Sequence, residues 1–412
     1  MKQTIFILFF IFFYASCNAQ QDKKNPENMQ AVTIPKAIAE KPDLPIITGA
    51  AQTVKYLFLL QNKKVGIVAN HTAFINQTHL VDSLLSLKVN VVKVFSPEHG
   101  FRGKADAGEK VNSEVDEKTQ LPIVSLYGNN KKPTTEQLQG LEVVVFDIQD
   151  VGARFYTYIS TMHYVMEACA ENNIPLIILD RPNPNGHFVD GPILEEKYKS
   201  FIGMHPVPIV HGMTVGEYAQ MINGEKWLAN QVQCDLTIVK MKNYDHLSAY
   251  ELPIKPSPNL PNMSSVYLYP SLCLFEGTPI SVGRGTALPF QVLGHPKINS
   301  EKYSFTPKSM EGAKKPKLEG QLCKGYNLSE YGNMCMRGLK KLNLFWLLDI
   351  YQNFPEKEGF FTSSFNLLAG TNQLQEQIKA GKTEQEIVAS WQDGLKQFKI
   401  TRKKYLLYRD FE

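Results

Sequence analysis

Short apolar segments of strand length alternate with helix-like segments between residues 65 and 179, and this alternation constrains the fold more than any other feature. Apolar stretches occupy residues 65–69, 89–95, 122–126, 141–148 and 174–179. Between them, apolar residues recur at helical spacing in 79–87, 134–138 and 155–169. Strands that alternate with helices favour a parallel sheet covered on both faces. The sequence therefore predicts an α/β protein with a doubly wound, mostly parallel sheet.

The N-terminus has the features of an export signal. Lys2 precedes an unbroken apolar run of 11 residues from Ile5 to Ala15, which is shorter than the ~20 residues that span a membrane. Small residues then lead into Cys17, as in the cleavage box of a bacterial lipoprotein. We expect lipid on Cys17 to anchor the chain in the outer membrane, facing the periplasm. Cleavage after Ala19, giving a soluble periplasmic or secreted protein, is the alternative.

The pattern changes near residue 253, where five prolines fall within eighteen residues and predict an extended, turn-rich segment. The second half ends in an amphipathic helix around Trp391, followed by a strand-like segment at 404–408. We therefore divide the chain into four predicted parts: a signal peptide (1–17), a linker (18–47), a sheet domain (48–258) and a second domain (259–412).

Composition and motifs exclude several functions. The net charge is only +4, and Lys and Arg form no long runs, so we expect no nucleic-acid partner. The chain lacks the dinucleotide, Walker A, GxSxG and HExxH patterns. The cysteines other than Cys17 lack zinc-ligand spacing, and we expect them to be buried, with at most one or two disulfides. We predict no cofactor and no metal, and the oligomeric state stays open.

Polar side chains follow three of the predicted strands, at the edge where doubly wound sheets bind ligands. The acidic ones are Glu98, Asp147, Asp150 and Asp180, and their neighbours include His99, Arg102, Arg154 and Asn183. Asp150 and Asp180 equally suit helix caps. Glu98 stands in a turn between Pro97 and Gly100, which makes it the strongest candidate for catalysis.

Further candidates come from later segments. They are Tyr156, Tyr158 and His163 after the fourth strand, His211 in a proline-containing loop, and Glu276 and Arg284 in a glycine-rich stretch. Arg284, between two glycines, suits an anion. Carboxylates, arginines and aromatic rings together fit glycoside hydrolysis, which uses a carboxylic acid and a second carboxylate beside the sugar.

Several strings resemble a known family. They include FSPEHGFRG at 95–103, the segment 146–161, DRPNP at 180–184, HGMTVGE at 211–217, PSPN at 256–259, GRGT at 283–286 and KYLLY at 404–408. In order, they resemble the exo-β-N-acetylmuramidases, a family first known as a domain of unknown function. The resemblance spans about residues 52–408. It implies a Rossmann-like domain, a second, smaller α/β domain and a cleft between them. Pro279 and His295, the latter standing before Pro296 where the family favours a small residue, depart from the family pattern, which bears on substrate preference.

The resemblance implies removal of terminal β-linked N-acetylmuramic acid from the non-reducing end of peptidoglycan fragments during cell-wall turnover. Glu98 would be the general acid, and Asp147 or Asp150 the second carboxylate. Arg154, Arg284 or Arg102 would pair with the lactyl carboxylate of the sugar. The remaining substrate-site candidates are His99, Tyr156, Tyr158, His163, Asp180, Asn183, His211 and Glu276. Retention and inversion stay open.

Two other functions also fit these residues. A non-catalytic lipoprotein that binds cell-wall sugars would keep the arginines and aromatic rings without needing the acid. A carboxylate-dependent hydrolase of another peptidoglycan bond would keep the acid and act on a different substrate.

Overall fold

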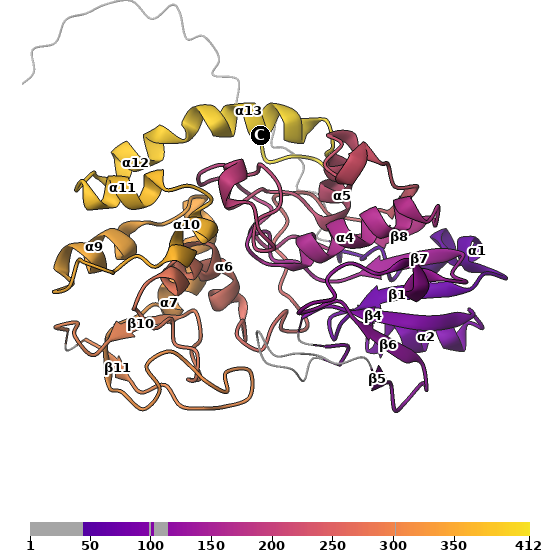
Figure 1. Ribbon diagram of the computed structural model, residues 1–412, viewed down its shortest axis with the longest axis horizontal. Helices are drawn as coiled ribbons and strands as arrows, with labels where there is room; N and C mark the ends of the chain where they lie inside the picture. The colour runs from indigo at the N-terminus through magenta and orange to yellow at the C-terminus, as the bar shows by residue number, and fades with distance from the viewer. Residues whose placement is uncertain (1–43, 99, 103–113, 301) are drawn as a thin grey trace, which may run out of the picture. The chain divides into compact units, whose positions relative to one another are not determined.

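A mostly parallel sheet forms the first part of the protein (Figure 1). The computed structural model describes residues 44–98, 100–102, 114–300 and 302–412. Within them, seven strands are ordered β5-β6-β4-β1-β7-β8-β9. Their bounds are β1 (Val65–Ala69), β4 (Val91–Ser96), β5 (Glu114–Val115), β6 (Pro122–Ser125), β7 (Val143–Asp147), β8 (Leu176–Leu179) and β9 (Leu236–Val239). All neighbours pair in parallel except β5, which runs antiparallel to β6.

Helices bury both faces of this sheet. Val144 and Phe146 of β7 join the core that contains α4 (Tyr158–Glu171) and α5 (Val215–Gly224). Val143 and Val145 join the opposite core, which contains α1 (Leu57–Leu60) and α2 (Leu80–Ser86). Alternate residues of a strand point to opposite faces, so a fully apolar strand requires cover on both. The predicted α/β, doubly wound fold is confirmed.

The strand order places the carboxyl ends of β1 and β7 at the centre of the sheet. From β1 the chain proceeds to β4 and β6 on one side, then returns to β7, β8 and β9 on the other. This is the strand order of the Rossmann fold, and ligands bind where it reverses. Asn70, Glu98 and Asp150 all follow strands close to that reversal.

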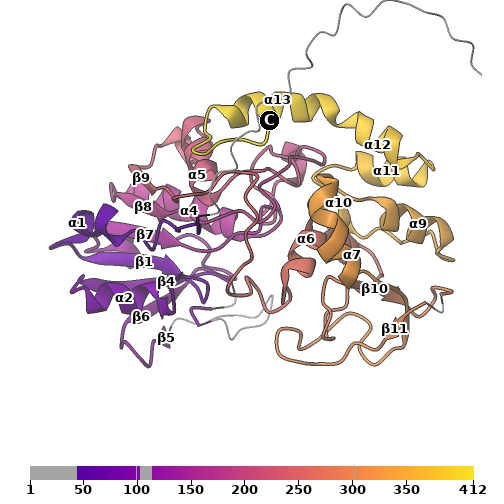
Figure 2. The ribbon, with the colours of Figure 1, turned by 180° about the vertical axis from the view of Figure 1, so that it is seen from behind.

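The second, smaller domain combines helices with a small sheet (Figure 2). Its antiparallel sheet has the order β10-β12-β11, with bounds β10 (Val292–His295), β11 (Ser304–Phe305) and β12 (Cys323–Asn327). Its helices are α6 (Met263–Leu272), α7 (Ser329–Tyr331), α8 (Arg337–Leu339), α9 (Phe345–Asn353), α10 (Ser363–Ala369), α11 (Gln373–Lys379), α12 (Glu384–Ser390) and α13 (Gln392–Lys403). A short helix, Cys273–Gly277, follows α6 directly.

The proline-rich segment is extended only in part, because α6 begins at Met263 and includes Pro270. Proline leaves the carbonyl four residues earlier without its helical partner. That carbonyl belongs to Val266, and it accepts a hydrogen bond from Asn185 Nδ2 at 3.2 Å. The tertiary contact therefore compensates for the bond that the proline removes.

The C-terminus also differs from the prediction. The strand predicted at 404–408 is wrong, because these residues pair with no strand in the described part of the chain. The terminal amphipathic segment forms two helices, α12 and α13, which meet at Trp391. The edge strand β9 and the hairpin of β2 (Phe74–Ile75) and β3 (Thr78–His79) were not predicted. These strands are short or half exposed, so they lack a continuous apolar run.

Three further predictions bear on the termini and cysteines. Residues 1–43, including Cys17, lie outside the described residues, as does most of the predicted linker. Ile47, at the end of that linker, already pairs with Lys242. The described cysteines are free thiols, and four of the five are buried. In the described residues, no helix is both long enough and apolar enough to cross a membrane. The three boundaries between the four predicted parts stay predictions.

Candidate functional site

Glu98 lines a pocket beside the carboxyl ends of the central strands. It follows β4, and its Oε2 accepts a hydrogen bond from Thr157 Oγ1 at 3.2 Å. Thr157 is the N-cap residue of helix α4, so the helix N-terminus lies next to the carboxylate. The pocket has an empty volume of about 440 Å³, and its other lining residues are Phe155, Tyr156, Thr157, Tyr158, Ser257, Asn259, Leu260, Tyr269, Arg284 and Phe290.

Aromatic rings form much of the pocket wall. Tyr156 packs edge-on against Tyr158 and Tyr269, with centroid distances of 4.9 and 5.8 Å. Tyr269 also packs against Phe155 and Phe290. The Tyr156 hydroxyl donates to the Pro256 carbonyl at 2.7 Å, which connects the sheet domain to the proline-rich segment. Such rings offer apolar faces to a sugar while edge-to-face contacts keep them in place.

Arg284 brings a positive charge to the same pocket. Its Nε donates to Glu276 Oε2 at 3.1 Å, and its guanidinium lies over the Phe290 ring, 4.9 Å from the centroid. Among the described residues, no other side chain accepts from its terminal amino groups. The hydrogen bond to Glu276 therefore fixes the direction of the Arg284 side chain. The two terminal amino groups of the guanidinium stay available for a ligand. Glu276 and Arg284, two of the predicted site residues, form an ion pair in the structure.

The predicted second carboxylates differ in their surroundings. Asp147 is fully buried and bound by Arg181 through two hydrogen bonds of 2.5 and 2.8 Å. Asp150 Oδ2 accepts from Gly152 N at 2.6 Å, and Oδ1 has no hydrogen-bond partner among the described residues. Burial raises the pKa of Asp150 to about 7. Neither carboxylate lines the pocket, but only Asp147 is neutralised by an ion pair.

Burial raises the pKa of Tyr158, and the negative charges of Glu98 and Asp150 both raise it further. Tyr158 lines the pocket, and its hydroxyl has no hydrogen-bond partner in the described part of the chain. Burial also raises the pKa of Tyr156, and the charge of buried Asp150 raises it further, so Asp150 acts on two side chains that line the pocket.

The structure does not bring Arg154 or Arg102 to the pocket. Arg154 is buried, and its guanidinium donates to the carbonyls of Pro192, Val207 and Leu368 at 2.7–2.9 Å. Arg102 forms an ion pair with Asp116 through two hydrogen bonds, of 2.8 and 3.1 Å. Both guanidinium groups are engaged by protein oxygen atoms, which gives them structural roles.

Asp180 and Asn183 also hold the fold together instead of lining the pocket. Asp180 accepts hydrogen bonds from Tyr408 Oη at 2.6 Å, Thr214 Oγ1 at 2.8 Å and Gly216 N at 2.8 Å. Burial raises its pKa to about 6. Asn183 Nδ2 donates to the Met213 carbonyl at 2.8 Å. The KYLLY string thus contributes a tyrosine that fixes the C-terminal tail onto strand β8.

Two of the three predicted histidines, His163 of α4 and His211, are buried. His163 Nδ1 and His205 Nε2 are 2.9 Å apart, and His205 Nδ1 lies 3.1 Å from the Tyr218 hydroxyl. His211 Nδ1 accepts from Met213 N at 3.2 Å, and its ring packs against Tyr218. Neither His163 nor His211 lines the pocket. His99 lies outside the described residues.

Sequence reasoning missed several residues that line the pocket. Tyr269, Phe290 and Leu260 come from the second half of the chain, as do Ser257 and Asn259. The PSPN string was a local signal for Ser257 and Asn259. Tyr269 occurs within helix α6 and had no distinguishing pattern. In the described residues, no three His, Cys, Asp or Glu side chains group as metal ligands.

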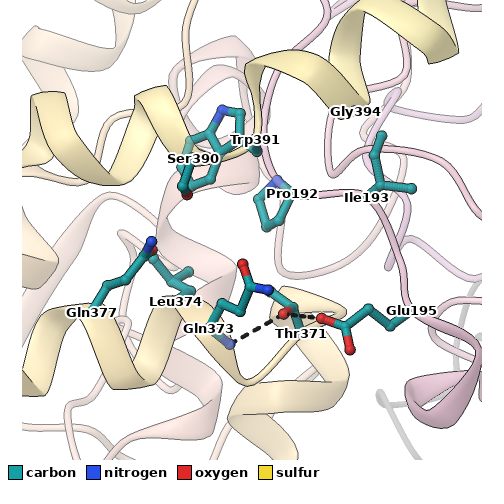
Figure 3. A pocket seen from close by; sticks show the side chains of 10 residues that line it. All are labelled: Pro192, Ile193, Glu195, Thr371, Gln373, Leu374, Gln377, Ser390, Trp391 and Gly394. Atoms are coloured by element: carbon teal, nitrogen blue, oxygen red, sulfur yellow. Dashed lines mark hydrogen bonds between the residues drawn. The ribbon is translucent and has the colours of Figure 1, made fainter.

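A second pocket, with an empty volume of about 570 Å³, is lined by residues of the 192–195 segment and of α11–α13 (Figure 3). Thr371 joins the backbone of Gln373 to the Glu195 carboxylate through hydrogen bonds (Figure 3). Glu195 also pairs with Lys197 at 3.0 Å, so the carboxylate of this pocket is already neutralised. None of the predicted site residues lines it.

Comparison with known proteins decides the family. The family model "Exo-beta-N-acetylmuramidase NamZ, N-terminal" matches residues 65–264, and its C-terminal counterpart matches residues 267–408. The chain belongs to the NamZ family of exo-β-N-acetylmuramidases. It is 42% identical to the peptidoglycan β-N-acetylmuramidase NamZ of Bacillus subtilis over 370 residues, which is 85% of this chain and 88% of that protein.

Two solved structures are also similar. Both are proteins of Bacteroides fragilis described as members of the DUF1343 family, and the matches cover 89% of this chain and 100% of theirs. They are 50% and 30% identical to this chain, with TM-scores of 0.83 and 0.75. The predicted NamZ family, and with it the enzyme class of a glycosidase, is confirmed.

Proposed function

We propose that the protein releases terminal β-linked N-acetylmuramic acid from peptidoglycan fragments, with Glu98 as general acid and Arg284 as the ligand of the lactyl carboxylate. One observation carries this proposal: Glu98 and Arg284, from different domains, line one pocket with aromatic walls. An acid, a guanidinium and ring faces are the groups that hydrolysis of an acidic sugar requires. A pocket also suits the single terminal sugar that an exo-acting enzyme binds.

Arg284 supports selection of muramic acid over neutral hexosamines. A guanidinium donates from five N–H groups and binds carboxylates through two parallel hydrogen bonds. Because Glu276 accepts from Nε, the two terminal amino groups are left for the substrate. Lysine has a single ammonium group and lacks two amino groups at a fixed spacing. Arg284→Lys is therefore expected to weaken binding of the lactyl carboxylate.

Glu98 protonates the glycosidic oxygen as the bond to the leaving sugar breaks. The Thr157 hydroxyl donates to Glu98 Oε2, which fixes the direction of the carboxyl group in the pocket. Asp150, whose charge acts on Tyr158, is the second carboxylate in this proposal, and its ionised form stabilises the positive charge that develops on the sugar ring. Asp147 is excluded from this role in the proposal because Arg181 already neutralises it.

The experiment compares Glu98→Gln with Glu117→Gln, a change at an exposed glutamate. The substrate is a disaccharide with N-acetylmuramic acid at its non-reducing end, and free N-acetylmuramic acid is measured by chromatography. Loss of a general acid lowers kcat by about 10²–10⁴-fold, whereas Glu117→Gln stays at the wild-type rate. Wild-type turnover by a folded Glu98→Gln variant would refute the assignment.

We also propose that the chain is exported and anchored by lipid on Cys17. The apolar run and the small residues before Cys17 support this proposal. Cells expressing the full chain or Cys17→Ser would be labelled with an alkyne fatty acid and fractionated. Label and membrane association that depend on Cys17 are expected, and unlabelled, soluble wild-type protein would contradict the proposal.

A further inference from the structure

The ammonium group of Lys317 lies inside a ring of backbone carbonyls. Nζ is 2.5 Å from the Thr278 oxygen and 3.3 Å from the oxygens of Phe275, Glu276 and Ile280. These four carbonyls belong to one short stretch, which begins in the helix Cys273–Gly277. An ammonium has three N–H donors. Its positive charge is attracted to all four carbonyl oxygens, which surround Nζ.

This stretch carries the partner of Arg284. Glu276, whose carbonyl binds Lys317, extends its carboxylate to Arg284 Nε at 3.1 Å. The backbone that sets the direction of the Glu276 side chain is therefore held by the Lys317 ammonium. Without that charge, four carbonyl dipoles would face one another, and their repulsion would favour rearrangement of the stretch.

The segment that carries Lys317 also supports the turn of Arg284 directly. Gly285 has a φ of +81°, and a Cβ there would meet Pro316 Cγ at 2.6 Å. Lys308 N donates to the Gly285 carbonyl at 2.9 Å. The 308–317 segment thus contacts the backbone of Gly285, which follows Arg284. Lys317, at the end of this segment, binds the carbonyls around Glu276.

We propose that Lys317 is a positioning residue that sets the direction of the Arg284 guanidinium and so determines selectivity for the carboxylate of the sugar. Lys317 does not line the pocket, and it acts through the carbonyl ring, Glu276 and Arg284. This inference rests on the proposed role of Arg284, and it assigns the origin of selectivity to a residue outside the pocket.

The test compares Lys317→Ala with Lys315→Met, a change at an exposed lysine of the same segment. Substrates are the muramic acid disaccharide and its methyl amide, in which the carboxylate is neutral. Lys317→Ala is expected to raise KM for the acidic substrate about tenfold with kcat nearly unchanged, as for loss of a binding interaction. KM for the amide stays near the wild-type value. An equal rise for both substrates would overturn the proposal.

Ammonium chloride provides a readout that a merely structural role would not give. The ammonium ion fits the carbonyl ring that Lys317→Ala leaves, so it is expected to lower KM and raise the Tm of this variant, relative to sodium chloride at equal ionic strength. Lys317→Met, which keeps most of the stem, replaces Lys317→Ala if the latter does not fold, with the same KM readout. Identical KM and Tm of Lys317→Ala in the two salts would overturn the carbonyl-ring mechanism.

Arg284→Ala separates this proposal from the proposed function. If Arg284→Ala alone leaves the preference for the acidic substrate intact, the proposed role of Arg284 fails, and the Tm in ammonium still tests the carbonyl ring. If Arg284→Ala removes the preference, adding Lys317→Ala is expected to change KM no further. Independent, multiplying effects of the two changes would show that Lys317 does not act through Arg284.

Discussion

Replacing Asp150 by Asn is expected to stabilise the protein at alkaline pH. Asp150 is 4% exposed, and burial raises its pKa from the ordinary 3.8 to about 7. At about 1.4 kcal/mol per pKa unit, ionised Asp150 costs the folded state about 4 kcal/mol. Asn keeps a carbonyl oxygen for the Gly152 N–H and carries no charge, so most of this cost disappears.

The sign of the pH dependence follows from linkage. The folded state binds the Asp150 proton more tightly than the unfolded state, so wild-type stability falls as pH rises from about 4 to about 7. Above pH 7 the cost is constant, and near pH 4 it is almost absent. The stabilisation by Asp150→Asn is therefore greatest at pH 8 and small at pH 4.

The assay is urea unfolding of wild type and Asp150→Asn at pH 4 and pH 8, with Asp235→Asn, at an exposed position, as the control. A stabilisation of Asp150→Asn that does not change between the two pH values would refute the electrostatic reasoning. Hydrolysis is measured on the same samples. A drop in kcat at increased stability is expected of a functional buried charge, and an unchanged kcat would remove Asp150 from the mechanism.

Two other predictions concern the fold. Tyr408→Phe removes a 2.6 Å hydrogen bond to buried Asp180, and is expected to reduce the free energy of unfolding by about 1–3 kcal/mol. Tyr303→Phe is the control in denaturant melts, and equal stabilities would contradict the prediction. Burial lowers the pKa of His79 to about 4, so the unfolded state binds its proton first and stability falls as pH drops from 6.5 to 4, by about 3 kcal/mol. His79→Gln, measured by melts across this range, should flatten the slope, and an unchanged slope would contradict the assignment.

Local sequence predicted the sheet well because each central strand is a continuous apolar run. β1 is buried along its whole length, and β7 is too. A strand buried on both faces consists mostly of apolar residues, so its pattern can be recognised without knowledge of its distant partners. The edge strand β9 alternates between half-exposed and exposed residues up to Val239 and therefore leaves a weaker pattern.

The arginines show where sequence reasoning reached its limit. Arg102, Arg154 and Arg284 all occur within four residues of a glycine and an acidic residue or a second glycine, and each suited an anion ligand. Arg154 instead binds carbonyls contributed by three separate segments, and Arg102 binds Asp116. Which oxygen atoms surround a guanidinium depends on segments far away along the chain, and no local pattern encodes them.

The sequence by itself determined the α/β class and the family and made Glu98 the leading candidate for the acid, because these depend on apolar periodicity and on contiguous strings of residues. Only the tertiary structure decided which charged groups share a pocket. It places Arg284 and Tyr269 beside Glu98, neutralises Asp147 with Arg181 and leaves Asp150 without an ion pair. The physical reason is that burial and pairing fix the charge and availability of a side chain, and both arise from residues brought together by folding.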